Sequence, residues 1–316
     1  GISGTALLRH SREGLCFNCH GDNIRSRRKN IAKTNIKAVM EKMSAHPVAD
    51  TSMLHRNSEK LPENDSAKER HVACQDCHRV HVTTDEEPTK GAKGYLPGNF
   101  RSRKPTGTPK GLRLKRANYE YEICYLCHAD SANLPGDSTN IAAEFNPDNA
   151  SYHPVEMKGR NKNVPSLKGG LTENSMISCI SCHNNDDPSG PSGPHGSDYE
   201  HILVAKYNTY DGPEYTAAYE LCYACHRRSS ILGDESFRLH QLHIAILETS
   251  CRTCHASHGS ALNAGLISFN RDIVDPPDSG GLIIYLSGGG GTPKCYLKCH
   301  GTNHTPDKVG SKAWPW

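Results

Sequence analysis

Cysteine and histidine recur in one arrangement along the whole chain. The sequence has 316 residues, all 14 of its cysteines fall into seven close pairs, and a histidine follows every pair directly. Six of the resulting motifs have the form Cys-x-x-Cys-His, and they are Cys16/Cys19/His20, Cys74/Cys77/His78, Cys124/Cys127/His128, Cys179/Cys182/His183, Cys222/Cys225/His226 and Cys251/Cys254/His255. The seventh, Cys295/Cys299/His300, has one additional residue between its cysteines. Such regularity indicates a chemistry that needs all three side chains at each site.

The Cys-x-x-Cys-His pattern is typical of covalent haem c attachment. Two thioether bonds fix the porphyrin to a short turn, and the adjacent histidine becomes the proximal ligand of the iron. Zinc sites, thioredoxin-like pairs and disulfide frameworks also use close cysteines, but none of them explains a histidine after every pair. We therefore expect seven haem c groups, whose irons are held on the proximal side by His20, His78, His128, His183, His226, His255 and His300.

Bound haem would also supply the interior that the side chains lack. Only 35% of the residues are hydrophobic, and the chain contains 28 glycines and 19 prolines. Such a chain has difficulty in burying a core of its own. We expect a mostly irregular, haem-packed fold with few short α-helices and minimal β-structure. Helices are predicted within 28–45, 119–128, 214–228 and 236–248, and short strands within 266–270 and 281–286.

The motifs alternate between two types. The odd-numbered motifs carry an aromatic residue after the first cysteine, at Phe17, Tyr125, Tyr223 and Tyr296, and the even-numbered ones do not. This alternation predicts a single elongated domain over 1–316, built from haem pairs in a line. The expected pseudo-repeats are 1–116 (haems 1 and 2), 117–212 (haems 3 and 4), 213–285 (haems 5 and 6) and 286–316 (haem 7).

Twelve further histidines can supply the distal ligands. Two of them begin a His-Pro-Val sequence at equivalent places in the repeat, and others follow the even-numbered motifs and the last motif. The expected distal ligands are His46, His81, His153, His195, His243, His258 and His304, with His10, His55, His71, His201 and His240 in reserve. Because His81, His258 and His304 follow a proximal histidine closely, we expect each of them to bind the iron of a neighbouring haem.

The chain resembles the secreted multihaem c-type cytochromes of metal-reducing and other anaerobic bacteria and archaea. The resemblance rests on the seven motifs and on Ser-Ala-His46-Pro-Val, Tyr-His153-Pro-Val, Gly-Pro-His195-Gly-Ser and Ala-Ser-His258-Gly-Ser. Within that group the chain is similar to the extracellular cytochromes that polymerise into conductive filaments, the cytochrome nanowires. The resemblance implies electron transport in anaerobic respiration through closely spaced bis-histidine haems. It also implies three kinds of partner: other copies of this chain, upstream outer-membrane or periplasmic cytochromes, and an extracellular electron acceptor. If one distal ligand comes from the next subunit, His10 is the first candidate.

Other functions remain open at this level. An electron shuttle in the periplasm or in an outer-surface complex would use the same chemistry. A multihaem reductase of a small oxyanion would need an iron with an open distal face. Because spare histidines suffice to close every iron, we expect an electron-transfer protein and not an enzyme.

Location and partners follow from the same chemistry. Haem c is attached outside the cytoplasm, so we expect an extracellular or cell-surface protein, with the periplasm as the alternative. No run of about 18 apolar residues is present, so no membrane span is expected. The formal charge of +3 is offset by two propionates on each haem, and nucleic-acid binding is not expected.

Overall fold

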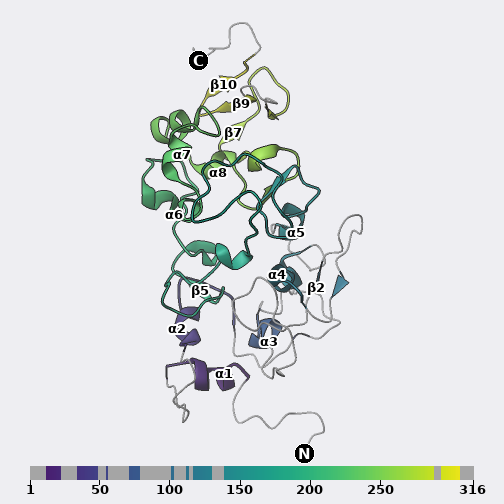
Figure 1. Ribbon diagram of the computed structural model, residues 1–316, viewed down its shortest axis with the longest axis vertical. Coiled ribbons are helices and arrows are strands. Elements are labelled where there is room, and N and C mark those ends of the chain that lie inside the picture. Colours follow the sequence, from purple (N-terminus) through teal and green to yellow (C-terminus); the bar gives the residue numbers. More distant parts are fainter. Residues whose placement is uncertain are drawn as a thin grey trace, which may run out of the picture. The chain divides into compact units, whose positions relative to one another are not determined.

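The computed structural model describes residues 12–22, 34–48, 55, 71–78, 101–102, 112–113, 117–129, 139–287 and 293–306. Short helices and two-residue strands alternate with long loops in this part of the chain (Figure 1). The chain divides into two compact units. Unit 1 comprises Gly1–Ala143 and Ile177–Ala205, and unit 2 comprises Glu144–Met176 and Lys206–Trp316.

Most helices are one or two turns long. The α-helices are α1 (Arg12–His20), α2 (Ile36–Met40), α3 (Cys74–Cys77), α4 (Glu120–His128), α5 (Ile141–Glu144), α6 (Glu220–Tyr223), α7 (Arg228–Leu232) and α8 (Cys251–Cys254). The 3₁₀ turns are η1 (Cys179–Ser181), η2 (Glu200–Ile202), η3 (Thr216–Tyr219) and η5 (Ala264–Leu266), and η4 (Gln241–Ile246) is a π-helix. Helices this short draw little stability from their own backbone bonds, so they depend on tertiary contacts.

Three antiparallel ladders have only two strands each. In unit 1, β1 (Ser44–Ala45) pairs with β5 (Gly196–Ser197), and β2 (Arg101–Ser102) pairs with β3 (Leu112–Arg113). In unit 2, β4 (Ser151–Tyr152) pairs with β6 (Gly259–Ser260). The β1–β5 and β4–β6 ladders join segments far apart in the sequence, and both are used below.

A larger sheet in unit 2 carries the seventh motif. Its strands are β7 (Val274–Asp275), β8 (Ile284–Leu286), β9 (Lys294–Cys299) and β10 (Thr302–His304). The order is β10-β9-β7, and β8 also pairs with β9. The motif cysteines Cys295 and Cys299 therefore lie on the central strand, each opposite a residue of a neighbouring strand.

The buried apolar side chains form small clusters. In unit 1, Tyr125 packs with Ala129 and Ala142. In unit 2, Tyr219 and Tyr223 pack with Ala218 and Ile244, and Cys222 and Cys251 lie against this cluster. The cysteines thus border the clusters, as they would if attached haem completed a core that the side chains begin.

The coarse fold prediction agrees with the structure, which has few helices, little strand and much coil. The helix predicted over 119–128 is confirmed as α4, and β8 lies inside the strand predicted over 281–286. Over 28–45, however, the described part holds only α2, and the helix prediction is wrong at Ser44–Ala45, where pairing with β5 makes a strand.

Two further helix predictions are too long and one strand prediction is wrong. Over 214–228 the chain forms η3, α6 and the start of α7, and over 236–248 it forms one π-helix. Residues 266–270 form no strand, since the backbone turns at Gly265 and Leu266 with positive φ. Among the described residues, no helix combines the length and the apolar character that crossing a membrane requires.

Candidate haem-attachment sites

Four of the first six motifs place both cysteines within one helix, namely α1, α3, α4 and α8. Residues three apart share a face of a helix, so Cys74 and Cys77 in α3 can reach the same flat group. Polar side chains fix the start of these turns. Asp76 accepts a hydrogen bond from Ala73 N at 2.8 Å, and Ser250 accepts one from Thr253 N at 3.3 Å. Such caps stabilise the turn before any group is attached.

The fourth and fifth motifs differ from these four at their second cysteines. Cys182 lies just beyond the end of η1, and Cys225 lies beyond the end of α6. The carbonyls of both cysteines accept backbone hydrogen bonds from distant segments, Cys182 from Val204 N at 2.8 Å and Cys225 from Lys168 N at 3.0 Å. The helical turn that encloses both cysteines in the other four motifs is incomplete at Cys182 and at Cys225.

A single backbone bond still holds each of these two cysteines near its partner. Cys182 N donates to the Cys179 carbonyl at 3.1 Å, and Cys225 N donates to the Cys222 carbonyl at 3.2 Å. All four side chains are partly buried. The assignment of Cys182 and Cys225 as haem thioether residues stays a prediction, and it now rests on a turn with one such bond in place of a continuous helix.

Consecutive motifs bring their first cysteines into contact. Hydrogen bonds join Cys16 to Cys74 and Cys124 to Cys179 in unit 1, and Cys222 to Cys251 in unit 2. The bond with Cys74 lowers the pKa of Cys16 to about 7, and the bond with Cys16 raises the pKa of Cys74. Groups attached at the two motifs of each pair would therefore start from adjacent sulfur atoms.

Two even-numbered motifs also neighbour the motif that follows them. Burial raises the pKa of the Cys77 thiol, and the nearby Cys124 and Cys127 thiols raise it further. Likewise burial raises the pKa of Cys254 to about 12, with Cys295 and Cys299 as further causes. The attachment sites are thus near one another in sequence order within each unit: sites 1 to 4 in unit 1, and sites 5 to 7 in unit 2.

Many of the described histidines are oriented through Nδ1. Nδ1 of His183 donates to the His201 carbonyl at 2.8 Å, and Nδ1 of His255 donates to the Gly265 carbonyl at 2.9 Å. His226 Nδ1 lies 2.8 Å from Ser166 Oγ. A neutral ring that donates from Nδ1 carries its lone pair on Nε2, which is the usual arrangement for a metal-binding histidine.

Several histidine rings face one another in pairs. In unit 1, ring centres are 6.4 Å apart for His46 and His128, and 5.9 Å apart for His78 and His195. In unit 2 the separations are 6.4 Å for His240 and His255, and 6.5 Å for His243 and His304. Two imidazoles that share one iron have centres roughly 6 Å apart, because each metal–nitrogen bond is about 2 Å long. The residues present therefore fit haem iron held between two histidines.

Burial lowers the pKa of several of the described histidines. Burial and the nearby His78 lower the pKa of His195 to about 4, and burial lowers those of His226 and His240 to about 4. Among the described residues, no partner lies within hydrogen-bonding reach of Nδ1 of His195 or His240. A buried neutral imidazole nitrogen without a hydrogen-bond partner is costly.

The two long-range ladders belong to one repeated arrangement, which we term the histidine cassette. The first cassette comprises 36–48 and 182–204 in unit 1, and the second comprises 144–155 and 254–268 in unit 2. In each, a serine-containing strand leads into His-Pro-Val and pairs with the strand of a His-Gly-Ser sequence. His46 therefore lies beside His195, and His153 lies beside His258, whose carbonyl accepts from His153 N at 2.9 Å.

The contacts of the two cassettes correspond. Nδ1 of His46 donates to the Pro194 carbonyl at 2.6 Å, and Nδ1 of His153 donates to the Ser257 carbonyl at 2.5 Å. In both cases the acceptor residue directly precedes the opposite histidine. Ser197 Oγ donates to the Leu203 carbonyl at 2.5 Å, as Ser260 Oγ does to Ile267 at 2.7 Å.

A glycine is required at the same point of each cassette. A Cβ at Gly196 would lie 2.0 Å from the Val39 carbonyl oxygen, and one at Gly259 would lie 2.0 Å from the Glu144 carbonyl oxygen. Both carbonyls belong to the short helix that precedes the His-Pro-Val strand. Only glycine allows this helix to approach the ladder, which explains Gly in both His-Gly-Ser sequences.

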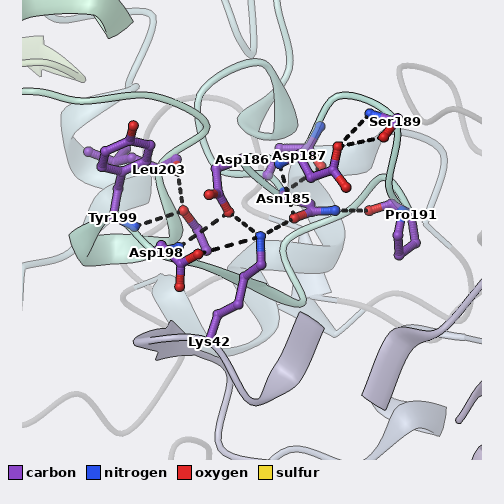
Figure 2. A network of polar contacts seen from close by, with 11 residues as sticks. Lys42, Asn185, Asp186, Asp187, Ser189, Pro191, Asp198, Tyr199 and Leu203 are labelled. Carbon is purple, nitrogen blue, oxygen red and sulfur yellow. Dashed lines mark hydrogen bonds and ion pairs between the residues drawn. The ribbon is translucent and has the colours of Figure 1, made fainter. Parts of the chain in front are cut away.

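A polar network fixes the loop before His195. Lys42 Nζ donates to Asp186 Oδ1 at 2.6 Å and to Asn185 Oδ1 at 2.9 Å, and Asp198 N also donates to Asp186 Oδ1 (Figure 2). Burial opposes the ionisation of Asp186, but the hydrogen bonds from Lys42 and the backbone hold its pKa below the usual value. The loop that carries His195 is thus tied to the segment that carries His46.

The seventh site differs from the others. Cys295 and Cys299 lie on one face of β9, since side chains in a strand alternate. His300 has φ of 47°, and its Nε2 donates to Asp211 Oδ2 at 2.7 Å. The ring that faces the expected distal ligand His243 is that of His304. The structure thus brings three histidines to this motif, but it does not place His300 opposite His243.

Some expected ligands have other surroundings. His258 Nδ1 donates to Glu144 Oε2 at 2.7 Å. His55 Nδ1 donates to Asp76 Oδ2 at 2.7 Å, and the His55 ring stacks on His71 with centres 4.5 Å apart. The His201 side chain is exposed. His10 and His81 lie outside the described residues.

Sequence reasoning missed three carboxylates. Glu120 accepts from Cys179 N at 3.0 Å and from Ile180 N at 3.1 Å, and burial raises its pKa. Asp211 accepts from Ser250 N at 2.7 Å and from Thr253 Oγ1 at 2.6 Å. Glu144 holds His258, as described above. Nothing local in the sequence marks these partners, because each lies far from the motif that it supports.

Comparison with known families places the chain. Residues 107–266, half of the chain, match the family model described as outer membrane cytochrome MtrC/MtrF-like, domains II/IV. Comparisons with curated proteins and with solved structures each found no match. The match covers motifs 3 to 6, the segment 182–204 of the first histidine cassette and nearly all of the second cassette. The chain therefore belongs to the MtrC/MtrF-like outer membrane cytochromes, a family of multihaem proteins of extracellular electron transfer.

Proposed function

We propose that the chain carries electrons through seven haem c groups, each with two histidine ligands, and has no substrate site. The seven motifs supply the thioether cysteines and the proximal histidines. The distal ligands are seven of eight histidines: His46, His81, His153, His195, His243, His258, His304 and, from the reserve, His240, whose ring lies near that of His255. The observation that carries the proposal is the set of histidine pairs at the separation that a shared iron requires.

The residues of the chain fix the haem and control its environment. Bound haem supplies reversible one-electron transfer at the iron. The cysteines fix its position on a short turn, and the Nδ1 hydrogen bonds orient the ligand rings. Contacts between first cysteines support haem pairs, and contacts of Cys77 and Cys254 with the next motif support a continuous chain of sites within each unit. Close spacing of this kind is what electron transfer between haems needs.

Assembly into conductive filaments remains a prediction from the family resemblance. Electron microscopy of the haem-containing extracellular fraction, prepared without detergent, tests it. Ordered filaments of uniform width that contain this chain would support a polymeric conductor. Small discrete particles would contradict it and leave a shuttle or a subunit of a surface complex.

Haem number and ligation have a direct test. The intact mass of the purified protein should exceed that of the polypeptide by seven haems, and its electron paramagnetic resonance spectrum should show only low-spin ferric iron. The variant in which Cys295 and Cys299 are both replaced by Ser should lose one haem and keep the rest. A high-spin ferric signal in the native protein would contradict full bis-histidine ligation and would favour an oxyanion reductase.

A further inference from the structure

We infer that the distal ligands cross between attachment sites, so that one histidine cassette serves two different irons. In the first cassette, His46 binds the iron of the third site and His195 binds the iron of the second. In the second cassette, His153 binds the iron of the fifth site. This inference rests on the proposed bis-histidine haems and states which histidine serves which iron.

The first cassette carries the argument because its two histidines lie side by side but face different motifs. His46 follows Ala45, and His195 precedes Gly196, the residue paired with Ala45 across the ladder. The ring of His46 faces His128, which belongs to the third motif, at 6.4 Å between centres. The ring of His195 faces His78, which belongs to the second motif, at 5.9 Å and with an interplanar angle of 14°.

A hydrogen bond at Nδ1 fixes the orientation of the His46 ring. Its Nδ1 donates to the Pro194 carbonyl, so the coordinating Nε2 is at the opposite edge of the ring. The first motif, which is the nearest in sequence before His46, is therefore not the site that it serves. The distal ligand of an odd-numbered site comes instead from the segment after the preceding odd-numbered motif.

The second cassette extends this rule. His153 has the position of His46, with the same Nδ1 bond to the residue before the opposite histidine. It follows the third motif, so the rule assigns it to His226 of the fifth. The third and the fifth sites then receive their distal ligands in the same way, each from the segment that follows the preceding odd-numbered motif.

Crossing has a chemical consequence. The iron of the second site and the iron of the third site are both tied to one two-strand ladder. A change in the ladder alters the ligation of two haems that belong to different pairs. The ladder is therefore a fixed link between the first haem pair and the second.

The assignment is tested by removing His46 from the full chain and from variants that each lack one haem-attachment site. His46→Ala in the full chain should convert one haem from low-spin to high-spin ferric. The same change in the protein lacking the third attachment site (Cys124→Ser and Cys127→Ser) should add no high-spin haem. In the protein lacking the first site (Cys16→Ser and Cys19→Ser), it should still add one. Met43→Ala is the matched control: its side chain is 68% exposed three residues before His46, and it should leave every haem low-spin.

The opposite pattern would overturn the inference, namely a new high-spin haem without the third site and none without the first. Should a haem-deficient variant not fold, a structure of the native haem-loaded protein decides directly. The iron bound by His128 should have His46 on its other face, and any other residue there would refute the assignment. If the assignment is refuted but the protein carries seven haems by mass and all irons are low-spin, the proposed function still holds. Failure of the ligand assignment and failure of the proposed function are therefore distinguishable.

Discussion

Gly259 is a residue at which a single added carbon should damage a histidine cassette. An ideal Cβ there would lie 2.0 Å from the Glu144 carbonyl oxygen and 3.1 Å from that of Ser151. An ordinary contact between carbon and a carbonyl oxygen is about 3.3 Å or longer. The end of α5 must therefore retreat by roughly 1 Å from β6, or the β4–β6 ladder must open.

Either outcome has an estimable cost. Forcing a methyl group into a packed site costs about 1–3 kcal/mol. Opening a two-residue ladder loses hydrogen bonds worth about 1 kcal/mol each. We expect Gly259→Ala to lower the free energy of unfolding by about 1–3 kcal/mol.

Guanidinium unfolding of the haem-loaded protein, followed by far-ultraviolet circular dichroism and by the haem absorption bands, measures this change. Gly212→Ala is the control in the same unit, since among the described residues no atom lies within 4 Å of a Cβ placed there. It should change stability by less than about 1 kcal/mol, because removing glycine from the unfolded chain is slightly favourable. Equal stability of the two variants would refute the reasoning. Gly196→Ala should reproduce the loss in unit 1.

Three further predictions concern polar groups that hold the sites in place. Lys42→Met should lower the free energy of unfolding by about 1–3 kcal/mol, because it leaves the largely buried Asp186 carboxylate without its cation. Lys37→Met, which breaks an exposed ion pair with Asp22, should change it by less than about 1 kcal/mol. Equal losses in denaturant titrations would contradict this. Glu120→Ala should lower the free energy of unfolding by about 1–3 kcal/mol in the same titrations, since the backbone amides of Cys179 and Ile180 lose their acceptor. Glu120→Gln should lower it less, because the Gln side chain keeps one acceptor oxygen. A Gln variant as unstable as the Ala variant would count against the capping role. Burial opposes the ionisation of Asp211, but hydrogen bonds from Ser250 and Thr253 lower its pKa, so its carboxylate stabilises the fold above its ordinary pKa and this contribution is lost as pH falls towards the lowered value. Stability measured from pH 6 to pH 3 should therefore fall less steeply in Asp211→Asn than in the native protein, and parallel curves would refute the assignment.

The chemistry of the sites could be predicted from the sequence because covalent attachment fixes the residues and their spacing. Cys124, Cys127 and His128 had to share one short turn, and α4 provides it. The irregular character of the fold followed in the same way from a composition too polar to form a core. These inferences needed only neighbours within a few positions of the chain. At Cys182 the turn ends early and the carbonyl bonds to Val204, a partner 22 positions away that no local pattern marks.

The arrangement of the distal histidines could not be predicted. His46 and His195 meet through a ladder of two residue pairs, and so short a strand gives no detectable periodicity. The Gly196 requirement depends on Val39, which is distant in sequence. At the seventh site the additional residue suits a strand, in which positions four apart share a face, but the sequence alone did not indicate β9.

The Nδ1 hydrogen bonds of the cassettes have a consequence for how such chains diverge. Four of these acceptors are main-chain carbonyls, and they belong to four different residue types, at Pro194, His201, Ser257 and Gly265. A main-chain carbonyl is present whatever side chain it carries, so substitution at these positions leaves the orienting bond in place. His258 differs, because its Nδ1 depends on the side chain of Glu144. At the other four histidines, ligand orientation can be inherited through the path of the backbone while the residues along that path change.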